Sequence, residues 1–436
     1  MKYDVIVIGG GLAGLTSAIR CSEAGLKTVV VSAGESALAF ASGSIDVLGI
    51  QKDNALVEFP FEAIRQLPSM HPYQKVGTES LPKGLAFFID QMAEAGIKLI
   101  SSDQQNHGRL TALGAIRPGW LSQEGSRSLS LSAPAEGLHR VAIINIAGFR
   151  DFQPALMAAG MKQQPGFSEV EFILADIKTE TLNINARNSY ELRSLELART
   201  LKRDLLSQPN GINVLSSALQ KAARDADLVV IPSVLAVEGG NEIIRQLESL
   251  TGLRICEVAT LPPSLPGMRM ASALKQRFRQ LGGILLEGDE VLSGFFEENQ
   301  LRSLKTKLNP DMPISASHFI LATGSFFSQG LASNRHQITE PVFGLDVDTS
   351  GSREQWSNSR FMDGNEHHFS HFGIKTGEQL NPYRNGQKVH NLYCAGAVLN
   401  GFNPVQEASS GGVAISTGWF AASRIIETLS QAEKSC

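Results

Sequence analysis

The sequence predicts an α/β fold in which one parallel-sheet domain carries a second α/β domain as an insertion. Three observations support this prediction. An apolar strand, a glycine-rich turn, a helix and a second strand follow one another at the start of the chain. Two similar strand–helix–strand patterns lie in the middle, and a glycine-ended strand and a long helix lie near the end. Alternation of this kind favours parallel sheets covered by helices.

The first strand–helix–strand unit is defined by its hydrophobic pattern. Residues Tyr3–Gly9 (YDVIVIG) form a continuous apolar, β-branched run, which is typical of a buried parallel strand. In Leu12–Gly25, apolar residues recur at helical spacing and the final glycine is a helix stop signal. Residues Lys27–Val31 (KTVVV) then predict the second strand.

Two further units of this kind are predicted over His139–Asp176 and Asp227–Val258. After the proline-rich segment Thr260–Met270 we expect a helix and a strand, and then a hairpin over Gly294–Thr306 that turns at Glu298-Asn299. Residues Ala316–Gly324 predict another buried strand, and the chain closes with NLYCAGAV, a Gly/Asn/Pro loop and a long helix. We therefore expect residues 1–48 and 261–436 to form one discontinuous domain, and residues 49–260 to form an inserted α/β domain.

Composition excludes several classes of function. The chain of 436 residues is 42% hydrophobic and 19% charged, with a formal net charge of -4. No basic run suggests a nucleic-acid surface, no apolar stretch approaches the ~20 residues of a membrane span, and the N-terminus has no signal-peptide pattern. Cys21, Cys256, Cys394 and Cys436 are too scattered to hold an iron–sulfur cluster, and they fit a reducing cytoplasm.

The motif GGGLAG supplies the spacing G-x-G-x-x-G through Gly9, Gly11 and Gly14. It follows a predicted buried strand and opens a helix with Leu12 and Ala13. In this context glycines permit a tight turn and a close backbone approach to phosphate, and the helix N-terminus offers free N–H groups. The sequence therefore predicts a Rossmann-like nucleotide-binding turn.

Ser32 departs from the usual dinucleotide site, because an acid normally stands at the end of the second strand to bind the adenosine ribose. Glu35 lies beyond the strand and is a doubtful substitute. Three explanations remain open. The adenosine half is bound less tightly, or it is absent and the cofactor is FMN, or a backbone group replaces the acid in an ordinary FAD site.

The C-terminal segment favours a flavin over a nicotinamide cofactor. Gly411 and Gly412, flanked by Ser410 and Val413, stand at the start of a predicted helix. Such a helix start approaches the pyrimidine end of a flavin, and its dipole stabilises the negative charge that collects there on reduction. Further glycines lie at the ends of two predicted strands on the same face. These are Gly324, after Thr323, and Gly396.

The N-terminal glycine motif, the strand that ends at Gly324 and the helix start at Gly411 and Gly412 together resemble the flavoprotein family that includes the fumarate reductase and succinate dehydrogenase flavoprotein subunits. In that family a loop of small residues after the second strand packs against the flavin. The loop Phe40–Gly49 (FASGSIDVLG) takes its place here, so the resemblance implies flavin contacts for Ser42, Gly43 and Ser44.

A narrower resemblance spans Tyr3 to about Ile426. The segments SALAFASGSIDVLG, HPY, TLPPSLPGMR, LATGSFFSQGL, EPVFGLDV and SSGGVA occur in the same order in the family of anaerobic glycerol-3-phosphate dehydrogenase B subunits. That resemblance implies a cytoplasmic FMN subunit that acts with a catalytic FAD subunit and a membrane-bound iron–sulfur subunit. The complex oxidises sn-glycerol 3-phosphate to dihydroxyacetone phosphate and reduces quinone. Alternatives are a stand-alone FAD-dependent reductase of the fumarate-reductase type, and an electron-relay or structural subunit.

Two residues are candidates for catalysis. Arg269 could face the flavin and hold a substrate phosphate, with Arg335 as a weaker candidate, although an interdomain or surface salt bridge is the competing explanation. His71 could carry a proton, or it could simply precede Pro72 in a turn. His367, His368 and His371 lack the further ligands of a metal site, so no metal is expected. The sequence assigns no base for the substrate hydroxyl.

Overall fold

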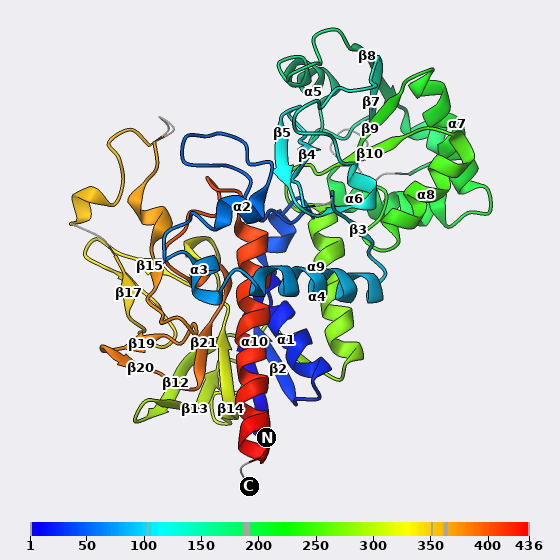
Figure 1. The fold of residues 1–436 in the computed structure, drawn as a ribbon. Coiled ribbons are helices and arrows are strands. Elements are labelled where there is room, and N and C mark those ends of the chain that lie inside the picture. The colour runs from blue at the N-terminus through cyan, green and yellow to red at the C-terminus, as the bar shows by residue number, and fades with distance from the viewer. Residues whose placement is uncertain (1, 103, 186–191, 350–351, 362–364, 435–436) are drawn as a thin grey trace. The chain divides into compact units, whose positions relative to one another are not determined.

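The computed structural model describes residues 2–102, 104–185, 192–349, 352–361 and 365–434. The chain divides into two compact units (Figure 1). Unit 1 comprises residues 1–37, 46–95 and 271–436, and unit 2 comprises residues 38–45 and 96–270. Within the described residues, no helix is both long enough and apolar enough to cross a membrane.

Unit 1 is built on a seven-stranded mixed sheet in the order β11-β2-β1-β14-β13-β12, with β21 also pairing β14. The parallel part joins β11, β2, β1, β14 and β21, and the hairpin β12–β13 adds antiparallel strands beside β14. The strands of the sheet are β1 (Lys2–Ile8), β2 (Thr28–Ser32), β11 (Ile284–Glu287), β12 (Val291–Glu297), β13 (Gln300–Thr306), β14 (Ile314–Leu321) and β21 (Leu392–Cys394).

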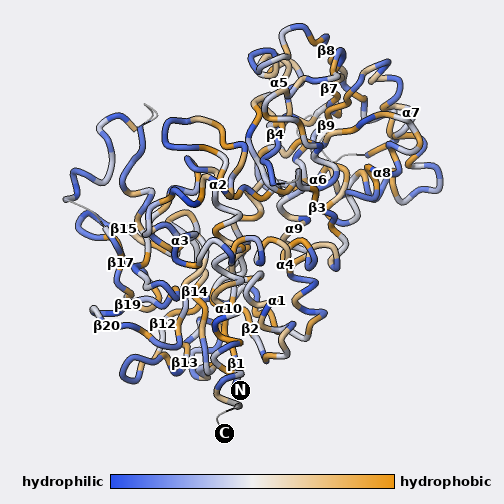
Figure 2. The backbone as a smooth tube through the Cα atoms, viewed as in Figure 1, coloured by the Kyte–Doolittle hydropathy of each residue, from blue (hydrophilic) through white to orange (hydrophobic). Residues whose placement is uncertain are grey.

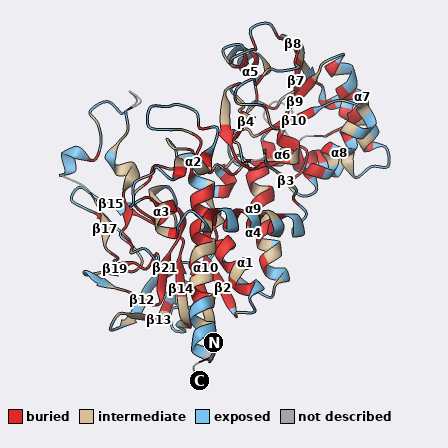
Figure 3. Ribbon diagram, in the orientation of Figure 1, coloured by how far each residue is buried: buried red, intermediate tan, exposed pale blue. Residues whose placement is uncertain are grey.

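The centre of this sheet is buried because its strands are continuous apolar runs (Figures 2 and 3). The predicted strands at Tyr3–Gly9 and Ala316–Gly324 are confirmed as β1 and β14, which pair in parallel. The predicted hairpin over Gly294–Thr306 is confirmed too, and Glu298 in its turn has φ +53°.

Helices α1 and α10 pack against each other beside the sheet (Figure 1). Gly418 permits this approach, because a Cβ there would lie 2.5 Å from the backbone oxygen of Ala13. The helices within unit 1 are α1 (Leu12–Glu23), α2 (Pro60–Ile64), α3 (Pro72–Val76), α4 (Ser80–Glu94) and α10 (Ser410–Lys434). Three short strand pairs complete it: β15 (Ala332–Ser333) with β16 (Ile338–Thr339), β17 (Val347–Asp348) with β18 (Gly373–Ile374), and β19 (Tyr383–Arg384) with β20 (Gln387–Lys388).

Unit 2 has its own four-stranded parallel sheet in the order β10-β9-β7-β8, with its own hydrophobic core. The two predicted central units are confirmed as β7–α5–β8 and β9–α8–β10. Its strands are β3 (Leu99–Ile100), β4 (His107–Leu110), β5 (Ile116–Gly119), β6 (Ser122–Gln123), β7 (Arg140–Ile146), β8 (Glu171–Ile177), β9 (Leu228–Pro232) and β10 (Ile255–Val258). Its helices are α5 (Pro154–Met161), α6 (Ser194–Thr200), α7 (Gly211–Ala223) and α8 (Gly240–Thr251), and a π-helix covers Leu201–Leu206.

The unit boundaries differ from those expected from the sequence. Residues 49–95 belong to unit 1, because α4 packs on α10 and a Cβ on Gly84 would lie 3.3 Å from the Trp419 side chain. Gln91 on α4 also donates a 2.9 Å hydrogen bond to Glu23 on α1. The junction falls inside α9 (Leu265–Gln280), after Met270, so residues 261–270 belong to unit 2.

Candidate functional site

The glycine turn between β1 and α1 has two different steric requirements. Gly9 has φ +110°, and a Cβ on it would lie 2.3 Å from the Ala322 carbonyl oxygen, so only glycine fits between β1 and β14. Gly11 has open space where a side chain would stand, and it precedes α1 without a side-chain cap. The helix N–H groups of Leu12 and Ala13 therefore face a space that suits a phosphate.

Ser32 at the end of β2 turns inward. Its side chain is buried and its hydroxyl donates to the Gly34 carbonyl oxygen at 3.2 Å. A Cβ on Gly10 would lie 2.7 Å from this hydroxyl, so Ser32 packs beneath the glycine turn. Glu35 is exposed, and Glu287, opposite Ser32 in register, is bound by Lys275 at 2.8 Å and by Arg279. Neither of these two acids is therefore both buried and uncommitted at this position.

The carboxyl ends of β1, β2, β14 and β21 meet at one edge of the sheet, which is where open α/β sheets bind ligands. Thr323 and Gly324 follow β14 there, and Gly396 follows β21. Among the described residues, the Thr323 hydroxyl is buried without a hydrogen-bond partner. A buried hydroxyl without a partner at the edge that carries the glycine turn fits a polar cofactor.

The start of α10 contributes to the same unit, but Gly412 has a structural reason of its own. A Cβ on Gly412 would lie 2.2 Å from the Tyr73 hydroxyl oxygen and 2.9 Å from the Val47 Cα. Its N–H donates to the Asp46 carbonyl at 2.7 Å. Gly412 therefore permits chain packing, while the N–H groups of Ser410 and Gly411 precede the first intrahelical bonds. Val413 is fully buried.

The loop with Ser42, Gly43 and Ser44 belongs to unit 2, so it is not among the residues that unit 1 brings together. It packs on the proline-rich junction instead. Gln123 donates from Nε2 to the carbonyl oxygens of Gly43 at 3.3 Å and Pro266 at 2.7 Å. A Cβ on Gly267 would lie 1.9 Å from the Leu38 carbonyl oxygen. The small-residue loop and the proline-rich junction, which are far apart in the sequence, thus pack against each other within unit 2.

Arg269 is committed to an ion pair rather than free for substrate. It donates from Nη1 to Glu257 Oε2 at 2.6 Å and from Nη2 to Oε1 at 3.0 Å, and from Nε to the Ala236 carbonyl at 2.7 Å. Arg269 and Glu257 are 4% and 2% exposed. This geometry argues against the substrate-binding role expected from the sequence, since the guanidinium already neutralises a buried carboxylate. Arg335 is exposed on a loop.

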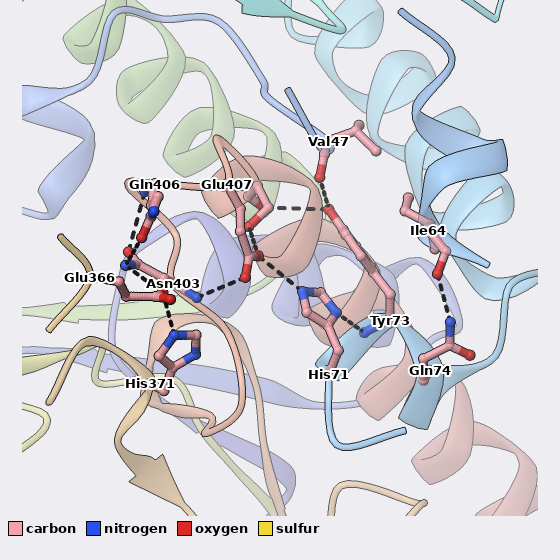
Figure 4. A network of polar contacts seen from close by, with 11 residues as sticks. Val47, Ile64, His71, Tyr73, Gln74, Glu366, His371, Asn403, Gln406 and Glu407 are labelled. Carbon is pink, nitrogen blue, oxygen red and sulfur yellow. Dashed lines mark hydrogen bonds and ion pairs between the residues drawn. The ribbon is translucent and has the colours of Figure 1, made fainter. Parts of the chain in front are cut away.

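His71 is also fixed by its neighbours, and this argues against its expected role as a proton carrier (Figure 4). It is 1% exposed and caps α3. Nδ1 accepts from the Tyr73 N–H at 3.1 Å, so the ring hydrogen lies on Nε2 and donates to Glu407 at 3.2 Å. Burial raises the pKa of Glu407, but the hydrogen bond from His71 leads the opposing contacts, and the net pKa lies below its usual range.

The histidine cluster has structural partners. His371 pairs with Glu366, and His367 accepts from the Asn358 N–H at 3.0 Å. No group of three metal-ligating side chains occurs among the residues that the structure describes. Cys21, Cys256 and Cys394 are buried, and burial raises the pKa of Cys21 and Cys256 to about 12, so these thiols are inert. Cys436 lies outside the described residues.

Sequence reasoning missed a polar group in unit 2. His107 is 2% exposed, and its Nε2 lies 2.7 Å from the Ser122 hydroxyl. Its Nδ1 and the Ser44 hydroxyl are buried without a hydrogen-bond partner in the part of the chain that the structure describes. The antiparallel bridge between Ile45 and Leu121 places Ser44 opposite Ser122. Burial, and then Arg109, lower the pKa of His107 to about 4. A lone histidine in NHGRL gave no signal of this arrangement.

This chain is similar to known proteins in sequence and in fold. Residues 4–413 match the family model FAD_binding_2, described as "FAD binding domain". The chain is 40% identical over 438 residues to the anaerobic glycerol-3-phosphate dehydrogenase B subunit of Vibrio cholerae serotype O1, covering 100% of this chain and 99% of the relative. It is 41% identical to the protein of the same name from Aliivibrio fischeri, covering 98% and 96%. A 3-ketosteroid delta1-dehydrogenase structure from Sterolibacterium denitrificans is 12% identical, with a TM-score of 0.43 and coverage of 98% and 100%.

Proposed function

Because this chain belongs to the family of anaerobic glycerol-3-phosphate dehydrogenase B subunits, we propose that it is the flavin-binding subunit of a quinone-linked complex. The complex oxidises sn-glycerol 3-phosphate to dihydroxyacetone phosphate. The observation that carries the flavin proposal is the ligand edge of unit 1. There an open glycine turn, helix N–H groups and the Thr323 hydroxyl, which has no hydrogen-bond partner among the described residues, lie at one end of the parallel strands.

We propose FAD as the cofactor, with FMN, which the resemblance to the family implies, as the alternative. The matched domain description supports FAD. Ser32 is compatible with it if a backbone group, in place of an acid, binds the ribose. The other proposed flavin contacts are those of the sequence prediction, from Gly9 to Gly14, at Thr323, Gly324 and Gly396, and at Ser410–Val413. Acid release of the cofactor followed by mass determination decides between FAD and FMN.

The residues of unit 1 bind and orient the cofactor in this proposal. The N–H groups at the start of α1 bind phosphate, and those of Ser410 and Gly411 stabilise negative charge at the pyrimidine end. When bound, the flavin supplies an acceptor for the hydride of the alcohol carbon. The hydroxyl proton needs a separate acceptor.

Rapid mixing of the flavin-loaded chain with sn-glycerol 3-phosphate tests whether the substrate is oxidised on this subunit. Bleaching of the oxidised flavin spectrum by the substrate alone supports oxidation on this subunit. If the chain is not bleached by substrate but is bleached by a reduced partner subunit, the chain relays electrons.

Partners follow from the family name, since a B subunit implies other subunits. We propose a catalytic FAD subunit and a membrane-bound iron–sulfur subunit, because the buried cysteines among the described residues form no cluster site. The complex would then hold this chain at the cytoplasmic face of the inner membrane. Activity of the isolated chain with quinone would instead support a stand-alone reductase. A chain that stays colourless after flavin addition would support a structural subunit.

A further inference from the structure

The loop Asn403–Ser409, which leads into α10, is held by a partly buried polar network within unit 1 (Figure 4). Glu407 is its centre. Its carboxylate accepts from His71 Nε2 at 3.2 Å, from the Asn403 N–H at 3.1 Å and from the Ser409 hydroxyl at 3.1 Å. The Glu407 backbone oxygen accepts from the N–H groups of Gly49 at 2.9 Å and Ile50 at 3.0 Å. The loop is therefore fixed by both its backbone and its one central side chain.

The direction of the Ser409 hydroxyl is the informative detail. A serine directly before a helix usually turns its oxygen to the free N–H groups of the first turn. Here Ser409 donates to Glu407 instead, and the Gly412 N–H donates to the Asp46 carbonyl oxygen. Among the described residues, no protein oxygen accepts from the N–H groups of Ser410 or Gly411. Two helix donors are thus left for a ligand.

Tyr73 reinforces this arrangement from α3. Its hydroxyl lies 2.5 Å from the Val47 carbonyl oxygen, to which it donates, and 3.4 Å from that of Ser409. The Ser409 carbonyl oxygen also accepts the first helical bond, from the Val413 N–H at 3.0 Å. The Ser409 carbonyl oxygen therefore accepts the first hydrogen bond of the helix, whereas the Ser409 side chain does not cap the helix.

We propose that Glu407, held by His71, is a positioning residue of the flavin site. It keeps the Ser409 hydroxyl away from the start of α10, so that the N–H groups of Ser410 and Gly411 remain available to the flavin. Its negative charge also opposes charge build-up on the reduced cofactor and lowers the midpoint potential. This inference rests on the proposed function, because it requires a flavin at α10.

Titration of the cofactor-free chain with FAD and with FMN, followed by flavin fluorescence, tests the hydrogen-bond part. Glu407→Ala frees Ser409 to cap the helix and is expected to weaken flavin binding about fivefold, the effect of one capping bond. The double variant Glu407→Ala/Ser409→Ala removes the competing hydroxyl and should return the affinity to within about twofold of wild type. If the double variant binds flavin as weakly as Glu407→Ala does, the Ser409 hydroxyl does not compete with the flavin for the helix N–H groups.

The midpoint potential tests the charge part, which a merely structural role would not move. Glu407→Gln keeps the acceptor oxygen but loses the charge, so it should retain affinity and shift the potential upward by about 20 mV or more. That shift equals a fivefold change in a two-electron couple. Glu366→Ala is the control, because it removes a neighbouring carboxylate that binds a histidine, His371, and the side chain of Asn403 at 3.1 Å, but does not accept from Ser409.

The outcomes separate this inference from the proposed function. A wild-type chain that binds neither flavin overturns both. A wild-type chain that binds flavin, with Glu407→Ala and Glu407→Gln unchanged in affinity and potential, overturns the role of Glu407 alone. Equal effects of Glu366→Ala would also overturn it, since they would indicate general loss of negative charge.

Discussion

Replacing Arg269 with methionine should destabilise unit 2 strongly and leave substrate recognition intact. Arg269 and Glu257 are both almost fully buried and share two hydrogen bonds of 2.6 and 3.0 Å. Removing the guanidinium leaves a buried carboxylate without a counter-ion, which costs about 3–5 kcal/mol of unfolding free energy. The additional bond to the Ala236 carbonyl places the expected value toward the upper end. Replacing both partners, in Arg269→Met/Glu257→Leu, should recover most of this loss, because two apolar side chains leave no buried charge.

Urea unfolding followed by tryptophan fluorescence can measure this loss in unit 2 alone. The chain has three tryptophans, and Trp120 is the one in unit 2. A background with Trp356→Phe and Trp419→Phe makes Trp120 the single reporter. The reasoning is refuted if Arg269→Met unfolds at the wild-type urea concentration while the complex shows a raised KM for sn-glycerol 3-phosphate. That result would make Arg269 a substrate ligand after all.

Three further predictions concern unit 1 and the cysteines. Gly9→Ala should cost about 1–3 kcal/mol of stability, because φ +110° and the Ala322 carbonyl both exclude a Cβ. Gly11→Ala should keep stability and lose flavin affinity. Thermal unfolding measures the first effect and flavin titration measures the second. Glu407 has a lowered pKa in the folded protein, so its contribution to stability is present above the unfolded pKa of about 4.3 and is lost as pH falls through the folded pKa. Glu407→Gln should flatten this part of a curve of unfolding free energy against pH. An unchanged curve would contradict the lowered pKa of Glu407. Cys21, Cys256 and Cys394 should resist a thiol reagent in the native chain and react after unfolding, as mass spectrometry of the labelled peptides would show.

The strands of the parallel sheets could be predicted from the sequence because a buried parallel strand is apolar along its whole length. Tyr3–Gly9, Ala316–Gly324 and the two central strand–helix–strand units all carry this local signal. The division into units could not be predicted equally well. Helix α4 belongs to unit 1 through contacts with α1 and α10, and α10 begins more than 300 residues later in the chain. No local pattern reports a partner at that distance.

The same reasoning separates the cofactor residues from the catalytic candidates. The φ of +110° at Gly9 belongs to the glycine turn, which the spacing of the motif predicts, although the close approach of the Ala322 carbonyl could not be predicted from that spacing. The roles of Arg269 and His71 depend on which acid each side chain meets. Glu257 is 12 residues from Arg269, and Glu407 is 336 residues from His71. Residue type alone suggested reactive groups, whereas the partners identify an ion pair and a loop support.

The contact between the small-residue loop and the proline-rich junction means that a substitution in one segment also affects the other. Neither Gly43 nor Gly267 can carry a Cβ without meeting the other segment, and Gln123 donates to both segments from one amide nitrogen. The Ser264 N–H adds a 2.7 Å bond to the Ala39 carbonyl oxygen. A change in the junction therefore moves the loop that carries Ser42, Gly43 and Ser44.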